Sequence, residues 1–171
     1  MENLQKEYGL YINGKWQPAS DGATFKTYSP ATGEELAVCA EATREDVDAA
    51  VKAAHAAWES WKNTTPVERA VILNKIADII DANAQHLAEV ESLDNGKPIR
   101  ETSMIDIPMS ADHFRYFAAA IRTEEGTATM LDNNTLSLVL HEPIGVVGQI
   151  IPWNFPCLLY TSPSPRDRSL S

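Results

Sequence analysis

Residues 141–156 read HEPIGVVGQIIPWNFP, and they carry the strongest signal for the architecture of this chain. The part from Ile144 to Ile151 is rich in β-branched residues and shows little alternation of polar and apolar positions. A strand that is covered on both faces reads as such a run, so the pattern predicts a central strand of a parallel sheet. The five residues Pro152-Trp-Asn-Phe-Pro156 follow directly, and prolines fix φ at both ends of this turn. We therefore expect a buried strand that ends in a rigid turn.

Two helix starts stand upstream of this strand. Thr43 and Asp46 resemble a capping box in which Asp takes the place of Glu, and an apolar face recurs at three-to-four spacing after them. Thr65 is a suitable cap for the next helix, Pro66 suits the first helical position, and Glu68 completes a second box.

The ends of the helices are also marked in the sequence. The second helix is expected to break or bend near Asn83, and Asn95-Gly96 is a C-terminal stop. A third helix is expected over about 99–123. Pro108 lies inside it, so we expect a kink or a late start there.

Short strands separated by turns are expected at both ends of this helical region. Asn13-Gly14 stands between apolar residues, which is a strong hairpin signal, and Asp132-Asn133-Asn134 marks a second hairpin. The strand candidates are residues 23–28, 35–39, 127–130 and 135–140.

Composition excludes some classes of partner. The chain has 171 residues and a formal net charge of −10, which disfavours nucleic acid and anionic membrane surfaces because both require clustered Lys and Arg. The N-terminus lacks a basic start followed by an apolar core, and no apolar run approaches the ~20 residues that span a bilayer. The two cysteines, Cys39 and Cys157, do not suggest a disulfide framework, so we expect a cytoplasmic protein.

Five motifs, taken together and in order, resemble the N-terminal part of the NAD(P)-dependent aldehyde dehydrogenase superfamily. They are YINGKW, YSPATGEEL, DNGKPIRET, DHFRYFA and HEPIGVVGQIIPWNFP, and they cover residues 8 to 156. DNGKPIRET and DHFRYFA lean toward the branch that acts on short aliphatic aldehydes such as acetaldehyde. The resemblance implies an incomplete α/β fold: a strand and helix segment that wraps a Rossmann-like cofactor domain, an oligomerisation hairpin, and the first core strand.

The resemblance also divides the chain. Residues 1–122 would be the strand and helical segment of the cofactor-binding domain, 123–142 the hairpin of the oligomerisation arm, and 143–156 the first core strand with its loop. Residues 157–171 are expected to be a non-native tail. The peptide CLLYTSPSPRD back-translates into a common transposase-type sequencing adapter, so we interpret this tail as adapter read-through.

The resemblance assigns chemistry to the turn. The side-chain amide of Asn154 would donate to the oxyanion that forms when a cysteine thiolate attacks an aldehyde carbonyl. Ile150, Ile151, Pro152 and Trp153 would line the cleft of the NAD or NADP cofactor. The alternative for Asn154 is a plain turn residue, and the alternative for the isoleucines is ordinary packing, which does not exclude cofactor contact.

Other candidates are weaker. Gly145-Val-Val-Gly148 is not a dinucleotide fingerprint. Cys39 is expected to pack as a small apolar residue, Cys157 is not to be mistaken for a catalytic cysteine, and Lys97 and Arg100 are interpreted as solvated or paired. No metal-ligand spacing is present.

Two functions therefore remain open. In the first, a complete aldehyde dehydrogenase converts a small-molecule aldehyde to a carboxylic acid and acts as a dimer or tetramer. This chain would then be an inactive portion of it, because it lacks the nucleophilic cysteine, the glutamate base, and the lysine and glycine-rich turn that bind the cofactor. In the second, a short non-catalytic protein pairs with a full-length partner through the hairpin. Within the enzyme class, an acyl-phosphate reductase or a semialdehyde enzyme stays possible.

Overall fold

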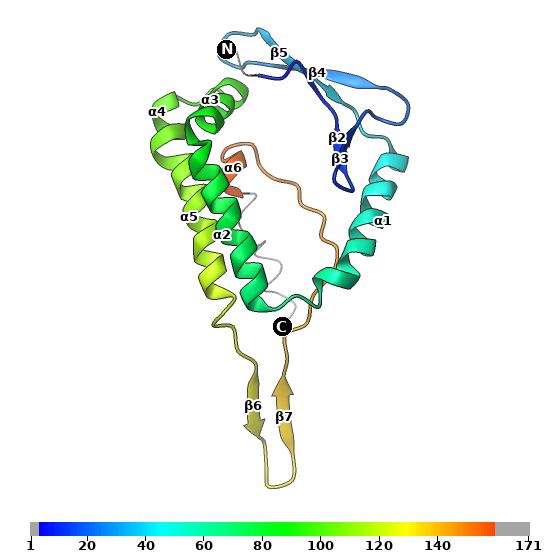
Figure 1. The fold of residues 1–171 in the computed structure, drawn as a ribbon, viewed down its shortest axis with the longest axis vertical. Coiled ribbons are helices and arrows are strands. Elements are labelled where there is room, and N and C mark those ends of the chain that lie inside the picture. Colours follow the sequence, from blue (N-terminus) through cyan, green and yellow to red (C-terminus); the bar gives the residue numbers. More distant parts are fainter. Residues whose placement is uncertain (1–3, 160–171) are drawn as a thin grey trace.

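A small mixed sheet forms one end of the molecule. The structure, a computed structural model, describes residues 4–159 (Figure 1). Strand β5 (Glu35–Ala40) lies in the middle of this sheet, with β1 (Glu7–Tyr8) parallel to it on one side and β4 (Thr24–Tyr28) antiparallel on the other. The two strands predicted at residues 23–28 and 35–39 are therefore confirmed.

A tight hairpin of β2 (Leu10–Ile12) and β3 (Lys15–Gln17) follows β1 in the chain. Its two turn residues, Asn13 and Gly14, both have positive φ angles, 52° and 77°. A two-residue hairpin of this kind requires positive φ at both turn positions, which Asn and Gly tolerate best. The sequence signal at Asn13-Gly14 is thus confirmed.

Three long helices and a broken fourth form the largest block of regular structure among the described residues. They are α1 (Arg44–Trp61), α2 (Pro66–Ala82), α3 (Ala84–Asn95) and the run of α4 (Ile99–Glu101), η1 (Thr102–Asp106) and α5 (Ile107–Ala120). Helix α2 packs along α5, as Figure 1 shows. The buried positions of these two helices are mostly small, with Ala70 and Ala77 on α2 and Ala111 and Ala118 on α5, so the backbones can approach closely.

Both predicted capping boxes are formed. The side chains of Thr43 and Thr65 accept from the backbone N–H groups of Asp46 and Glu68, and each carboxylate accepts in return from the cap residue's own N–H. The predicted break near Asn83 separates α2 from α3, and Gly96 ends α3 in the left-handed region at φ 80°. Local side-chain chemistry therefore sets these helix boundaries.

The third predicted helix is interrupted before Pro108. Residues Thr102–Asp106 form a π-helical turn, in which the N–H of Ile107 bonds to the carbonyl of Thr102 five residues back. Proline lacks an N–H and its ring clashes with the carbonyl four residues earlier, and the wider π turn relieves that clash. The expected irregularity is therefore confirmed, and α5 starts late, at Ile107.

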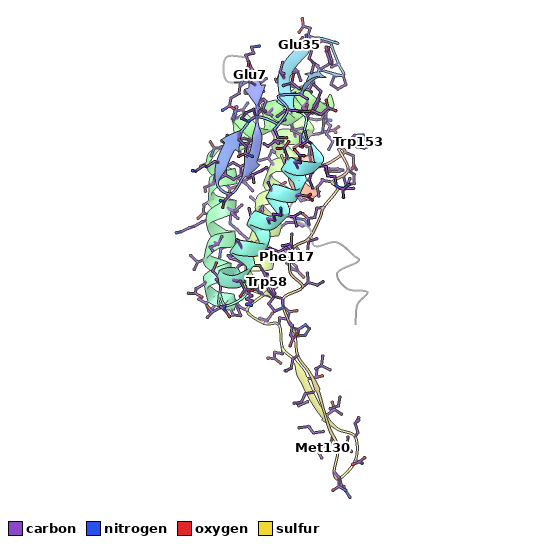
Figure 2. All side chains as sticks on the ribbon, turned by 90° about the vertical axis from the view of Figure 1, so that its right-hand side faces the viewer. Glu7, Glu35, Trp58, Phe117, Met130 and Trp153 are labelled. Atoms are coloured by element: carbon purple, nitrogen blue, oxygen red, sulfur yellow. The ribbon has the colours of Figure 1, made fainter. Side chains whose placement is uncertain are left out.

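A long antiparallel arm projects from the helices. It is built from β6 (Thr127–Met130) and β7 (Leu136–Val139), as the second hairpin signal predicted, and it extends away from the rest of the chain in Figures 1 and 2. All four residues of β6 are exposed, and on β7 only Ser137 is partly buried. The arm is thus held to the molecule only at its base.

The strand predicted over Ile144–Ile151 is not formed, and that prediction is wrong for the chain as described. The whole stretch has no regular secondary structure, and Ile144, Val147 and Ile150 are 62%, 48% and 100% exposed. A parallel strand exists only when neighbouring strands accept its backbone hydrogen bonds, and no other strand of the described part of the chain lies beside this segment. The apolar pattern encodes burial in a sheet that these residues cannot make alone.

The helices also leave apolar faces open. Val47 and Val51 of α1 and Val67, Val71 and Ile79 of α2 are all more than two-fifths exposed. Monomeric domains rarely expose apolar side chains in such numbers on adjacent elements, and exposed apolar faces of this kind are typical of surfaces that contact other parts of a protein. Within residues 4–159, no helix is long and apolar enough to cross a membrane.

One carboxylate ties the N-terminal sheet region to α1. Asp46 accepts from the backbone N–H of Thr43 at 2.9 Å and from that of Ser20 at 3.1 Å. These two donors, Thr43 first, hold the pKa of Asp46 below its ordinary value of 3.8. The charged carboxylate is therefore favoured by folding.

We predict that this carboxylate makes stability fall in acid. Its contribution is fully present above the ordinary pKa and is lost as the pH falls through the lower folded pKa. Asp46→Asn should therefore unfold at lower urea concentration than wild type at pH 7, and the gap should narrow below about pH 4. Circular dichroism during urea titrations at pH 3, 5 and 7 measures this, with Asp48→Asn on exposed α1 surface as the control. A constant gap across these pH values would contradict it.

Candidate functional site

The turn from Pro152 to Pro156 connects the irregular segment to a short last helix, α6 (Pro156–Leu159). Pro156 occupies the first helical position, where the missing N–H costs nothing because it would be unpaired anyway. Helix α6 packs against α5. One end of the turn is thus anchored on the helices, while the other leads into exposed chain.

Asn154 lies at the exposed apex of this turn. Its side chain is exposed, as are those of Pro152 and Trp153, the latter 84%. Figure 2 shows Trp153 at the outer edge of the molecule. No hydrogen bond joins the Asn154 amide to another residue of the described range, so none of these residues occupies its N–H donors.

The four residues predicted to line a cofactor cleft, residues 150–153, are consecutive in the chain, and three of them are exposed to solvent. Ile150 is fully exposed and Ile151 is partly buried. The alternative reading of Ile150 as ordinary packing is therefore not seen in this chain. Apolar side chains that stand free beside an unpaired amide fit one wall of a ligand site whose other walls come from elsewhere.

The inner side of the turn rests on a charged side chain. The ammonium of Lys97 lies 3.5 Å from the centroid of the Phe155 ring, and Phe155 is partly buried. The same ammonium forms an ion pair with the carboxylate of Asp106, whose side chain is 2% exposed. The reading of Lys97 as paired is confirmed, and the pair also contacts the turn.

A largely buried polar cluster extends from the Asp106 side of this ion pair. It consists of Glu91 and Ser92 of α3 and Thr102 and Asp106 of η1. The hydroxyl of Thr102 donates to the carbonyl of Ala88 at 3.0 Å and lies 2.8 Å from the hydroxyl of Ser92. These bonds attach the π-helical turn to α3, and so fix where Asp106 stands.

Glu91 is the unusual member of the cluster. It is only 4% exposed, and neither carboxylate oxygen has a hydrogen-bond partner in the described part of the chain. Burial raises the pKa of Glu91, and the nearby Asp106 carboxylate acts in the same direction. The physical reason is that a carboxyl group is costly to bury in its charged form.

Cys157 lies in the same surroundings. Burial, with the Glu91 and Asp106 carboxylates as further causes, raises the pKa of its thiol to about 12. Burial likewise raises the pKa of Cys39 in β5. Because the thiolate is the nucleophile, neither side chain is suited to attack a carbonyl near neutral pH.

Glu91 and Asp106 were not singled out from the sequence. One signal for Glu91 was present: it follows Ala84, Leu87 and Ala88 at helical spacing, so it stands on the buried stripe of α3. The contact of Lys97 with Phe155 had no such signal, because the two residues are far apart in the chain and meet only when α6 packs. Within residues 4–159, no group of three or more His, Cys, Asp or Glu is placed to hold a metal ion.

Comparisons with known proteins show the family to which this chain belongs. Residues 16–164 match the Aldehyde dehydrogenase family, and the chain belongs to that family. It is 53% identical over 158 residues to an aldehyde dehydrogenase of Rhodospirillum rubrum, and 50% identical over 157 residues to acetaldehyde dehydrogenase 2 of Cupriavidus necator. Each alignment covers 92% of this chain and 31% of the relative, so the chain spans about a third of the length of these proteins.

The fold agrees as well. The NAD+ complex of aldehyde dehydrogenase from Bacillus cereus superimposes with a TM-score of 0.87 at 44% sequence identity, covering 92% of this chain and 33% of that one. The mixed α/β class is confirmed by this likeness. The domain boundaries expected at residues 122, 142 and 156 stay predictions, as does the non-native tail expected at residues 157–171, of which residues 160–171 lie outside the described residues.

We predict that the Cys157 thiol reacts slowly. A pKa of about 12 against an ordinary 9.0 leaves, at pH 8, about 1000-fold less thiolate than an ordinary cysteine would have. Mass spectrometry after iodoacetamide treatment should show slow alkylation of the folded chain and fast alkylation in urea. Glu91→Gln should speed the folded reaction in part, whereas Glu89→Gln on the exposed face of α3 should not. Equal rates in buffer and urea would contradict the assignment.

Proposed function

We propose that the complete protein, of which this chain spans a part, oxidises an aldehyde to a carboxylic acid with NAD or NADP. The observation that carries this proposal is the free amide of Asn154, exposed on a turn that two prolines stiffen. Membership of the aldehyde dehydrogenase family supports it. The protein would then be an NAD(P)-dependent oxidoreductase.

In this proposal, Asn154 stabilises charge as the reaction develops. When a thiolate attacks an aldehyde carbonyl, negative charge moves onto the carbonyl oxygen, and a fixed N–H donor is worth most at that moment. An amide suits the task because it is neutral and has no proton to lose at working pH. The flanking prolines restrict the backbone, so less ordering remains to be done when the substrate arrives.

The cofactor would lie beside the same turn. Ile150, Ile151, Pro152 and Trp153 fit one wall of its cleft, since Ile150 and Trp153 present bare apolar surface on which a flat ring can rest. A bound nicotinamide accepts a hydride. The described residues contain no glycine-rich phosphate turn of the dinucleotide-binding kind, so the remaining walls belong to the rest of the protein.

This chain alone is proposed to be inactive. Its two cysteines have raised pKa values, and the family's nucleophile, general base and cofactor lysine are not among its matched motifs. Without a thiolate, no covalent intermediate forms and there is no hydride to transfer.

The substrate is proposed to be a short aliphatic aldehyde. The motifs DNGKPIRET and DHFRYFA point to that branch, and the Cupriavidus necator relative is named an acetaldehyde dehydrogenase. For the cofactor, the Bacillus cereus structure contains NAD+, which makes NAD the first cofactor to test.

The arm is proposed to pair subunits of the complete protein, which would be a cytoplasmic homo-oligomer. Met130, Leu136 and Leu138 are all more than half exposed, on two strands whose outer edges have no neighbour among the described residues. Exposed apolar edge strands are stable in solution when another strand or surface covers them. This supports pairing through the arm, in a dimer or a tetramer.

We predict that the amide of Asn154 is essential to turnover in the complete protein, obtained by extending the reading frame from the source DNA. Asn154→Ala should lower kcat for acetaldehyde oxidation about 100- to 1000-fold, the usual loss for one oxyanion donor, with little change in NAD affinity. NADH absorbance measures the rate. Asn134→Ala, in the exposed turn of the arm, is the matched control. Retained activity in Asn154→Ala would overturn the proposed role.

We also predict that the 171-residue chain produces no NADH from any aldehyde and binds NAD too weakly for calorimetry at micromolar concentration. The physical reason is that residues 150–153 would form only one wall of the NAD cleft, without the backbone N–H groups and side chains that bind the phosphates and ribose of NAD. Micromolar affinity in a calorimetric titration would show that these residues form a complete site. If the chain instead forms a stable complex with the full-length enzyme through its arm, that result would favour the alternative of a short non-catalytic protein that pairs with a full-length partner.

A further inference from the structure

We propose that Lys97 is a positioning residue of the oxyanion turn, by which we mean residues 152–156. Its ammonium is paired with the carboxylate of Asp106 and contacts the ring of Phe155, and this contact sets the orientation of the neighbouring Asn154. The inference rests on the function proposed above and adds to it a residue from a different part of the chain. It is carried by the contacts of the Lys97 side chain.

The first step is how Lys97 is held. Gly96 ends α3, and the backbone N–H of Lys97 then bonds to the side-chain oxygen of Asn95 at 2.8 Å. This directs the chain away from α3 while the Lys97 side chain turns inward, where it is only 19% exposed. An ammonium with so little water around it requires protein partners.

The second step is how its anion is held. Asp106 is the last residue of the π-helical turn and is 1% exposed. Its carbonyl accepts from the Ser110 hydroxyl at 2.8 Å, and Thr102 at the other end of the turn is bonded to α3. The carboxylate that clamps Lys97 therefore stands on backbone fixed at both ends, and the irregular turn before Pro108 has a structural use.

The third step is what the ammonium holds. It lies over the face of Phe155 at 3.5 Å from the ring centroid, within the range of a cation–π contact, which strengthens as water is excluded. Residues 152–154 on one side of Phe155 are exposed, so the turn's protein contacts begin at Phe155. Because Asn154 is the next residue, fixing the Phe155 ring restricts the backbone that aims its amide.

Aliphatic packing alone would not do the same. An apolar residue at position 97 could contact Phe155 but would leave the buried Asp106 carboxylate without its cation, next to the equally buried Glu91. Arginine can keep both the charge and the stacking on an aromatic ring. Lys97→Arg is thus the conservative variant, and Lys97→Met the one that removes the charge at similar length.

The test uses the complete enzyme with three variants and one control. Lys97→Met and Phe155→Leu should each lower kcat on the order of 10- to 100-fold with a smaller change in KM, since a misplaced catalytic group costs about that much. Lys97→Arg should recover most of the rate. Lys75→Met, at an exposed position of α2, should behave as wild type. The double variant Lys97→Met with Phe155→Leu should be no slower than either single variant, because both remove one contact.

A second readout does not depend on catalysis. Hydrogen exchange measured by mass spectrometry on the peptide covering residues 150–156 should speed up in Lys97→Met and Phe155→Leu, while peptides from α2 stay unchanged. Unchanged exchange in both variants, or losses of kcat that multiply in the double variant, would overturn the positioning role. If Asn154→Ala keeps full activity while exchange still responds to Lys97→Met, the proposed function fails and the anchoring of the turn stands.

Discussion

A strand in the middle of a parallel sheet has to exchange hydrogen bonds with a strand on each side, and this requirement governs what the chain can and cannot build. Residues 144–151 have the composition of such a strand, yet they lie open because no neighbour is present in the described part of the chain. The same shortage leaves Val47 and Val71 exposed on α1 and α2. These open surfaces share one property: each is an apolar face that no described residue covers.

What does form is stabilised locally. The capping boxes at Thr43 and Thr65, the positive φ angles of Asn13 and Gly14 and the left-handed Gly96 are satisfied by residues within a few positions of each other. The contact of α2 with α5 is the main exception, and it includes small buried side chains and the pairing of Arg115 with Asp78 and Asp81. The contacts that hold these elements all lie within the described residues.

The candidate site lies between the exposed segment of residues 144–151 and the helices that the described residues stabilise. One side of the turn is exposed, whereas the other contacts Lys97, which joins side chains of α3 and the π-helical turn in a largely buried polar cluster. The cluster is costly to bury, because it contains two carboxyl groups and a single ammonium. In the inference proposed above, the use of this cluster is to position the turn that carries Asn154.

The sequence by itself determined the boundaries of helices and hairpins and the identity of the turn residue Asn154, because capping, turn chemistry and short motifs act between near neighbours. It could not determine that residues 144–151 would lie open, since an apolar pattern reports what a segment needs and not whether a partner is there. Nor could it pair Lys97 with Phe155, although it had marked Lys97 as solvated or paired. Only the tertiary structure decided that contact, because the two side chains meet through the packing of α3, the π-helical turn and α6, and no periodicity relates them.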